Sequence, residues 1–203
     1  MKGGWLVGAA GIVVLAYITL NSLRTEGVGS RGPSVGERLP PFAMPLAGSE
    51  SEADANVATR PDSGPAGARP ACTVRGPEIL NVCELAERGP VVLAFLTAGA
   101  GRCEDQVDVL DRVAPRHPAV GFAAVAIRGS REDLRRTLRE RGWALPVGHD
   151  RDGAVANLYG VAVCPRVTFA RRGGEVAGTA LGFLDQRALE VRATALAAGR
   201  PLP

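Results

Sequence analysis

The pattern of apolar and polar positions predicts one central strand–turn–helix unit. Val91–Leu96 is an unbroken apolar run, which predicts a strand buried on both faces of a sheet. Small residues follow at 97–101, and then Cys103, Val107 and Leu110 recur at the spacing of one helix face. Because a helix N-terminus stabilises negative charge, a cysteine in the first turn of this helix favours a thiolate. The unit is typical of redox proteins.

The segments after this unit alternate between strand and helix patterns. Ser130 and Asp133 predict the start of a helix at 131–141, and Asp185 predicts the start of a last helix that runs to about Ala198. The other expected elements are strands at 121–127, 145–147, 167–170 and 175–180, a short helix at 154–159 and a hairpin turn at 171–174. Parallel crossovers followed by an antiparallel edge predict the α/β class, with a central mixed sheet flanked by helices.

The beginning of the chain predicts a membrane anchor. Residues 3–23 carry no charge, and about 21 helical residues at ~1.5 Å each span roughly 30 Å, the thickness of a bilayer core. A cleaved signal peptide is the alternative, but no small-x-small cleavage site follows Leu20. Four cysteines in a small domain suit an oxidising compartment. We therefore expect a single-pass protein of the cell membrane whose C-terminal domain lies outside the cytoplasm.

The chain divides into an anchor, a tether and one domain. Residues 1–24 are expected to form a cytoplasmic stub and one transmembrane helix, 25–34 a tether, 35–199 the folded domain and 200–203 a tail. Residues 48–70 are polar and small, with several prolines and almost no large apolar side chain. We interpret this segment as a flexible insertion that buries no core.

Two of the four cysteines frame a turn next to this insertion. Cys72 and Cys83 enclose two short strand-like runs that are separated by Gly76 and Pro77. A disulfide across these strands would close a short ring and fix the edge of the domain. The alternative is a pair of half-buried, unpaired thiols. In an oxidising compartment we favour the structural bridge.

Composition excludes several classes of function. The net charge of the 203 residues is +3, which is too small to argue for a nucleic-acid partner. The chain holds two histidines, no Gly-rich phosphate loop and no Gly-x-Ser-x-Gly motif. We therefore expect no cofactor and no metal ion, and the oligomeric state stays open.

The segment from Phe95 to Cys103 resembles the active-site segment of thioredoxin-fold proteins. It is similar to that of the membrane-anchored thiol–disulfide oxidoreductases in the alkyl hydroperoxide reductase/thiol-specific antioxidant superfamily, which carry Phe-Trp-Ala-x-Trp-Cys-x-x-Cys. Phe95 matches the Phe and Cys103 the second cysteine. The first, nucleophilic cysteine of the motif falls on Ala100, which cannot attack a disulfide. The Cys-x-x-Cys motif is therefore degenerate.

Two further segments carry the same resemblance. The stretch from Tyr159 onward resembles the family segment Tyr-Gly-Val-x-x-x-Pro, whose proline is cis and faces the active site, and Pro165 matches that proline. Residues 35–42 resemble the family motif Gly-x-x-x-Pro-x-Phe. The resemblance implies a thioredoxin-like fold over about 35–198. It also implies that Cys164, immediately before the proline, lies against the helix that carries Cys103.

Three functions are compatible with these residues. In the first, Cys103 and Cys164 form a reversible pair beside Pro165 and exchange with protein thiols or disulfides. In the second, Cys103 alone reduces peroxide, with Arg102 or Arg166 supplying a cation for its thiolate, although the carboxylates of Glu104 and Asp105 would oppose that thiolate. In the third, the cysteines are structural and the domain is a catalytically inactive binding module.

Overall fold

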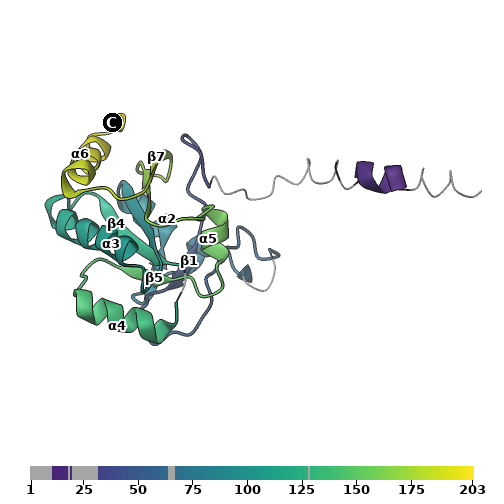
Figure 1. Ribbon diagram of the computed structural model, residues 1–203, viewed down its shortest axis with the longest axis horizontal. Helices are drawn as coiled ribbons and strands as arrows, with labels where there is room; N and C mark the ends of the chain where they lie inside the picture. The colour runs from purple at the N-terminus through teal and green to yellow at the C-terminus, as the bar shows by residue number, and fades with distance from the viewer. Residues whose placement is uncertain (1–10, 18, 20–31, 64–66, 128) are drawn as a thin grey trace, which may run out of the picture.

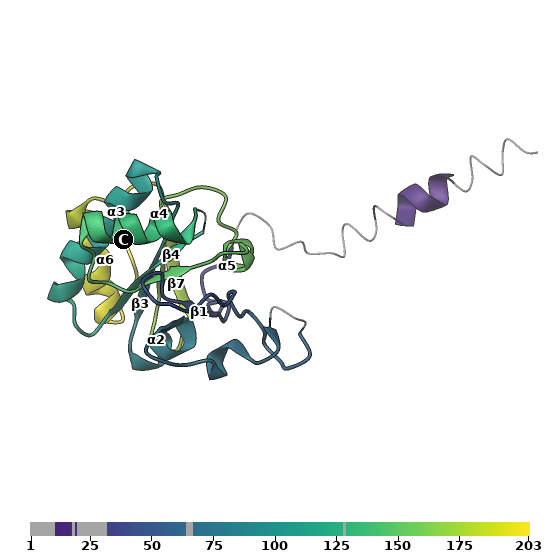
Figure 2. The same cartoon turned by 90° about the horizontal axis from the view of Figure 1, so that it is seen from below.

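The computed structural model describes residues 11–17, 19, 32–63, 67–127 and 129–203. Its centre is a five-stranded sheet in the order β5 (Val147–His149), β4 (Gly121–Ala126), β3 (Val91–Leu96), β6 (Arg166–Ala170) and β7 (Val176–Leu181). Helices α3 (Gly101–Val113), α4 (Arg131–Arg141) and α6 (Gln186–Ala197) cover one face, as Figures 1 and 2 show. The other face is covered by α2 (Val82–Arg88), α5 (Ala154–Leu158) and a small sheet of β1 (Ala43–Pro45) and β2 (Ile79–Asn81). The domain is thus an α/β sandwich of three layers.

Strand β3 (Val91–Leu96) lies in the middle of the sheet, as its apolar run predicts. All six of its residues are buried, and they alternate between the two hydrophobic clusters on either side of the sheet. It pairs in parallel with β4 (Gly121–Ala126) and antiparallel with β6 (Arg166–Ala170), which continues through a hairpin into β7 (Val176–Leu181). The predicted mixed sheet is therefore confirmed.

Local side-chain signals set the ends of the helices as predicted. The Ser130 hydroxyl accepts the backbone N–H of Asp133 at the start of α4, and the Asp185 carboxylate accepts that of Ala188 at the start of α6. Strand β5 (Val147–His149), in contrast, begins two residues later than predicted. The reason is a distant side chain on α3, since the carboxylate of Asp111 accepts the backbone N–H groups of residues 144 and 145.

The insertion at 48–70 packs more closely than its composition predicts. The Arg131 guanidinium of α4 donates to the carbonyl oxygens of Ser49, at 3.0 Å, and of Ser51. Ala55 and Ala58 are buried, with 1% and 2% of their surface exposed. The prediction that the insertion buries no core is wrong for these two positions, because an alanine needs little volume to pack against the domain. Flexibility of the rest of the insertion stays a prediction.

A disulfide joins Cys72 and Cys83, but it does not cross between paired strands. Cys72 lies in the 3-10 turn η2 (Ala71–Thr73), and Cys83 lies in the first turn of α2. The predicted strand pairing is wrong because the side chain of Asn81 organises this turn instead. Its amide donates to the Ala71 and Val74 carbonyl oxygens, at 3.0 and 2.8 Å, and its oxygen caps α2.

The predicted membrane span lies mostly outside the described residues. Residues 11–17 are helical, and Ile12, Val13, Leu15 and Tyr17 expose more than half of their surface. Within the described ranges, no helix combines the length and apolar character needed to cross a bilayer. The anchor at 3–23 and most of the tether at 25–34 stay predictions.

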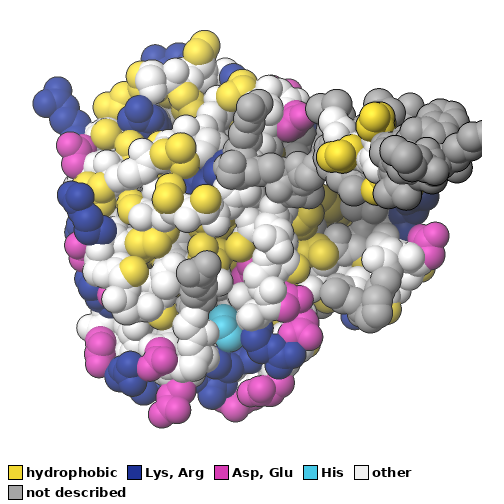
Figure 3. All heavy atoms as spheres, turned by 45° about the vertical axis from the view of Figure 1, so that its right-hand side comes forward, with side chains coloured by type: hydrophobic (Ala, Val, Ile, Leu, Met, Phe, Trp, Pro, Cys, Tyr) yellow, Lys and Arg dark blue, Asp and Glu magenta, His cyan; other side chains and the backbone are white. Residues whose placement is uncertain are grey.

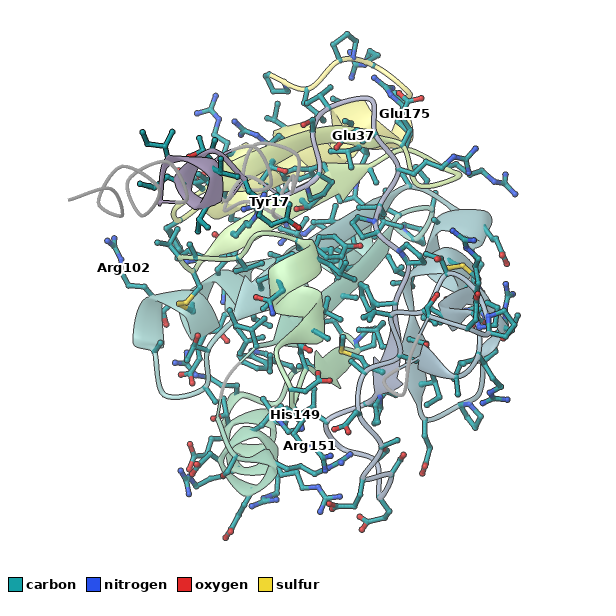
Figure 4. All side chains as sticks on the ribbon, turned by 90° about the vertical axis from the view of Figure 1, so that its right-hand side faces the viewer. Tyr17, Glu37, Arg102, His149, Arg151 and Glu175 are labelled. Atoms are coloured by element: carbon teal, nitrogen blue, oxygen red, sulfur yellow. A yellow bond between two sulfur atoms is a disulfide. The ribbon has the colours of Figure 1, made fainter. Side chains whose placement is uncertain are left out.

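The described end of the tether packs tightly against the domain. Gly32 has a φ of +64°, and a Cβ atom there would lie 2.0 Å from the Tyr159 carbonyl oxygen and 2.4 Å from Nη2 of Arg166. Farther along, Gly36 donates its N–H to the Val176 carbonyl oxygen. This places Glu37 next to Glu175 at the start of β7, as Figure 4 shows. The chain therefore joins the domain beside the residue that follows Pro165.

We expect Gly32→Ala to destabilise the domain more than Gly36→Ala. Both glycines have positive φ, so each substitution strains the backbone, but a Cβ at Gly36 meets nothing within 4 Å. The clash at Gly32 should add roughly 1–3 kcal/mol to the loss of unfolding free energy. Urea denaturation of the two variants measures the difference. Equal losses would show that the tether does not pack against Tyr159.

A buried carboxylate organises the start of α5. Asp150 is 1% exposed and accepts the backbone N–H groups of Val155 and Ala156, at 3.1 and 2.7 Å. Burial raises the pKa of Asp150 from its usual 3.8 to about 6. The adjacent His149, which lies near Arg151 at the end of β5 in Figure 4, has its pKa lowered, also mainly by burial.

These two shifts have opposite effects on stability. The protonated Asp150 carboxyl stabilises the folded state. This contribution to the unfolding free energy is fully present below about pH 4 and is lost as the pH rises through about 6. The stabilising contribution of neutral His149 is present above the usual pKa of histidine and is lost on acidification. As the pH rises from 4 to 6.5, the wild type should lose unfolding free energy that Asp150→Asn keeps. We expect the variant to gain on the order of 2–3 kcal/mol of unfolding free energy relative to the wild type over this range. Parallel pH profiles of urea unfolding for the two proteins would contradict this assignment.

Candidate functional site

The turn between β3 and α3 places Cys103 at the C-terminal edge of the central strand. Residues 97–100 form this turn, in which Gly99 has a φ of +78°. Ala100 is the N-cap of α3 and is half-buried. Cys103 lies in the first turn of α3, as predicted, and only 4% of its surface is exposed. Its sulfur is therefore largely closed to solvent.

The loop before β6 reaches the same edge of the sheet. The peptide bond between Cys164 and Pro165 is cis. Because Arg166 pairs with Phe95 near the end of β3, the two residues before it lie beside the start of α3. Pro165 is buried, and its carbonyl oxygen accepts the N–H of Gly182 at 2.9 Å. The loop is thus held between β3 and the segment after β7.

A disulfide joins Cys103 and Cys164, whose Cα atoms are 5.5 Å apart. Cys164 is half-buried and thus more accessible than Cys103. Thr97, which sequence reasoning missed, has its Oγ1 3.7 Å from Sγ of Cys164. A disulfide sulfur carries no hydrogen, so the threonine hydroxyl is the donor. Its place directly after β3 is the signal that could have identified it.

Three exposed apolar side chains lie close to the loop that carries Cys164. The exposed fractions are 58% for Val163, 66% for Leu181 and 42% for Phe183. Val163 precedes Cys164, and the other two flank Gly182, whose N–H binds the Pro165 carbonyl oxygen. Figure 3 shows hydrophobic side chains gathered over the upper part of this side of the domain and charged ones around α4 below. Arg102 extends from α3 into solvent, as Figure 4 shows. Such a surface suits contact with an extended polypeptide.

Comparisons with known proteins identify the architecture. No protein-family model and no curated protein matches the chain. Among solved structures, a secreted Mycobacterium tuberculosis disulfide oxidoreductase homologous to E. coli DsbE is 25% identical, with a TM-score of 0.53 over 58% of this chain and 89% of that one. Mycobacterium tuberculosis DsbF, solved in mixed oxidised and reduced forms, is 28% identical, with a TM-score of 0.50 over 54% and 81%. StoA from Bacillus subtilis is 16% identical, with a TM-score of 0.50 over 55% and 87%.

The chain has a thioredoxin-like fold. Its neighbours include a disulfide oxidoreductase, and the superfamily inferred from the sequence fits these structures. Two of the family-like segments also meet in space, since the Tyr159 hydroxyl donates to the Pro40 carbonyl oxygen at 2.9 Å and its ring packs edge-on against Phe42. Burial raises the pKa of Tyr159 well above its usual value.

A buried arginine holds the cis-proline loop in place. Arg166 is 3% exposed, and its Nη1 donates to the Gly160 carbonyl oxygen at 2.9 Å. Burial lowers the pKa of Arg166. This hydrogen bond connects the end of α5 to the residue after Pro165, so it fixes the cis-proline loop from the side opposite the bridge. Within the described part of the chain, no three His, Cys, Asp or Glu side chains are grouped to hold a metal ion.

Proposed function

We propose that this protein is a membrane-anchored, extracytoplasmic thiol–disulfide oxidoreductase in which Cys103 and Cys164 are the redox pair. The observation that carries the proposal is the disulfide between the first turn of α3 and the residue before the cis-proline. Ala100 stands where the nucleophile of a Cys-x-x-Cys motif would be, so Cys164 supplies the sulfur that the motif lacks. The thiol:disulfide oxidoreductases among the structural neighbours support this chemistry.

The exposed sulfur decides where exchange begins. A substrate thiolate attacks Sγ of Cys164, the bond to Cys103 breaks, and Cys103 leaves as a thiolate that takes up a proton. A second substrate thiolate then attacks the substrate sulfur of the mixed disulfide and releases Cys164. The substrate dithiol loses two electrons and two protons and becomes a disulfide, while the protein becomes a dithiol. The reverse sequence reduces a substrate disulfide.

The surroundings of the bridge favour protein substrates. An extended polypeptide can contact Val163, Leu181 and Phe183 while its thiol approaches Cys164. The peroxidase alternative requires Cys103 as a free, accessible thiolate. Here its sulfur is bonded to Cys164 and the residue is 4% exposed, so the geometry favours exchange with thiols.

The test is a redox titration of the full-length protein against a dithiol peptide. We expect the peptide to become a disulfide while peptide mapping shows the Cys103–Cys164 linkage disappear in equal amount. A linkage that persists in the presence of excess dithiol would reject the proposal and favour the binding module. Consumption of peroxide by the reduced protein, without exchange, would favour the peroxidase.

Orientation of the anchor is a separate part of the proposal. The uncharged stretch 3–23 supports one membrane span with the redox domain outside the cytoplasm. We expect protease added to intact cells to remove the domain from the full-length protein. Protection of the domain until the membrane is permeabilised would show the opposite orientation.

A further inference from the structure

The residue that follows Cys103, the cysteine that leaves first in this reaction, carries a buried carboxylate. Glu104 follows Cys103 in the first turn of α3 and is 7% exposed. Its Oε1 accepts the backbone N–H of Gly99 at 2.7 Å. The carboxylate therefore turns back toward the turn that precedes α3, at the end of the helix where the macrodipole is positive. A thiolate on Cys103 would depend on the same positive potential.

The counter-charge of Glu104 comes from a different helix. Its Oε2 lies 2.9 Å from Nη2 of Arg141, the last residue of α4. Arg141 also pairs with Asp105 at 3.2 Å and with Asp108 at 2.6 Å. One guanidinium is thus shared among three carboxylates. Burial by itself lowers the pKa of Arg141, but the hydrogen bonds to Asp105 and Glu104 outweigh it, so the pKa is raised. The formal charge of this cluster, three carboxylates and one guanidinium at the start of α3, is negative.

The other charged groups near the bridge do not reverse this balance. Arg102, on the same turn of α3, is exposed and points into solvent, where its charge is screened. Arg166 is buried on β6, and its Nη1 is directed to the Gly160 carbonyl oxygen. A like charge near an ionisable group disfavours its charged form. Ionisation of Cys103 would place a second negative charge in the same first turn of α3 as Glu104.

We propose that Glu104 keeps the Cys103 thiol protonated and so makes the Cys103–Cys164 bridge a weak oxidant, with Arg141 limiting the size of this effect. A disulfide oxidises strongly when its reduced form is stabilised as a thiolate, and a thiol of higher pKa is a poorer leaving group. The significance of Glu104 for function rests on the proposed exchange reaction. Its effect on the Cys103 thiol can be measured without that reaction.

Three variants separate this role from a structural one. Glu104→Gln removes the charge but can still accept the N–H of Gly99. We expect it to lower the pKa of the Cys103 thiol by about one unit and, at a pH above that pKa, to shift the dithiol–disulfide equilibrium by up to about tenfold toward the reduced form. Arg141→Gln leaves the carboxylate without its counter-charge, so both quantities should move in the opposite direction. Asp105→Asn is the matched control, since its side chain also binds Arg141 but is 53% exposed. Its effect should be smaller.

The thiol pKa is measured in the full-length protein carrying Cys164→Ser, where Cys103 is a single free thiol. The ultraviolet absorbance of the thiolate is followed against pH. The redox equilibrium is measured separately on proteins with both cysteines, against dithiothreitol. An unchanged or higher thiol pKa in Glu104→Gln would overturn the inference, as would shifts of the same sign in Glu104→Gln and Arg141→Gln. Failure of the proposed function would instead appear as an absence of exchange with the dithiol peptide.

Discussion

The variant Cys164→Ser is expected to lose the ability to oxidise a dithiol peptide. With the dithiol peptide in large excess, which drives exchange even with a weakly oxidising bridge, the wild type should form about one substrate disulfide per protein chain, because each Cys103–Cys164 bridge accepts two electrons. Serine cannot form a disulfide with Cys103, so the variant lacks this bridge, and the remaining Cys103 thiol has no electrons to accept. The yield should therefore fall to the uncatalysed background. It is measured by mass spectrometry of the peptide under anaerobic conditions.

A second substitution controls for misfolding. Ala100 lies three residues before Cys103 at the start of α3, so Ala100→Cys in the Cys164→Ser background creates the spacing of a Cys-x-x-Cys motif. We expect this double variant to regain dithiol oxidation, because the introduced cysteine can form a disulfide with Cys103. Unchanged oxidation in Cys164→Ser alone would show that the oxidising equivalents come from elsewhere, and Cys72–Cys83 would then be the remaining source.

The parts of the fold that the sequence predicted well are set by local patterns. The apolar run predicted β3 correctly, because a strand buried on both faces of a sheet needs only apolar residues. Ser130 and Asp185 cap helices through hydrogen bonds to residues three positions away, so their signals are also local. These elements could be placed without knowledge of the tertiary structure.

The errors arose where a distant side chain determines the backbone. Asp111 binds residues 144 and 145 and so delays the start of β5, although more than 30 residues separate them. Arg131 binds the Ser49 carbonyl oxygen of the insertion from 82 residues away. The Asn81 amide binds the carbonyl oxygens of Ala71 and Val74, so the chain around Cys72 forms a 3-10 turn rather than a strand. A pattern of neighbouring residues contains no signal for such contacts.

The candidate site was predictable only in part. The placement of Cys103 in a first helical turn follows from periodicity, but its proximity to Cys164 came from resemblance to a family with a cis-proline loop. Spacing alone could not pair cysteines that are 61 residues apart. The sequence showed that Glu104 is next to Cys103, but not that Arg141 on α4 binds it. The electrostatics of the site therefore required the structure.

The other large effect is expected for stability rather than for exchange. The double variant Cys72→Ala/Cys83→Ala removes a bridge between residues 11 positions apart. Without this short ring the unfolded chain gains conformational freedom, which should reduce the free energy of unfolding by about 2–3 kcal/mol. For a domain of this size the melting temperature should fall by roughly 5–10 °C. Calorimetry of both proteins measures the change.

Exchange with a dithiol peptide should survive in the same double variant. The turn around Cys72 retains the hydrogen bonds of Asn81 and the contact of Arg75 with Glu87, so its backbone is held even without the disulfide. Cys83 and Cys103 also pack on opposite faces of the central sheet, with β3 between them. Loss of this bridge should therefore leave the redox pair intact. A variant that melts like the wild type but no longer exchanges would assign the redox role to Cys72 and Cys83 instead.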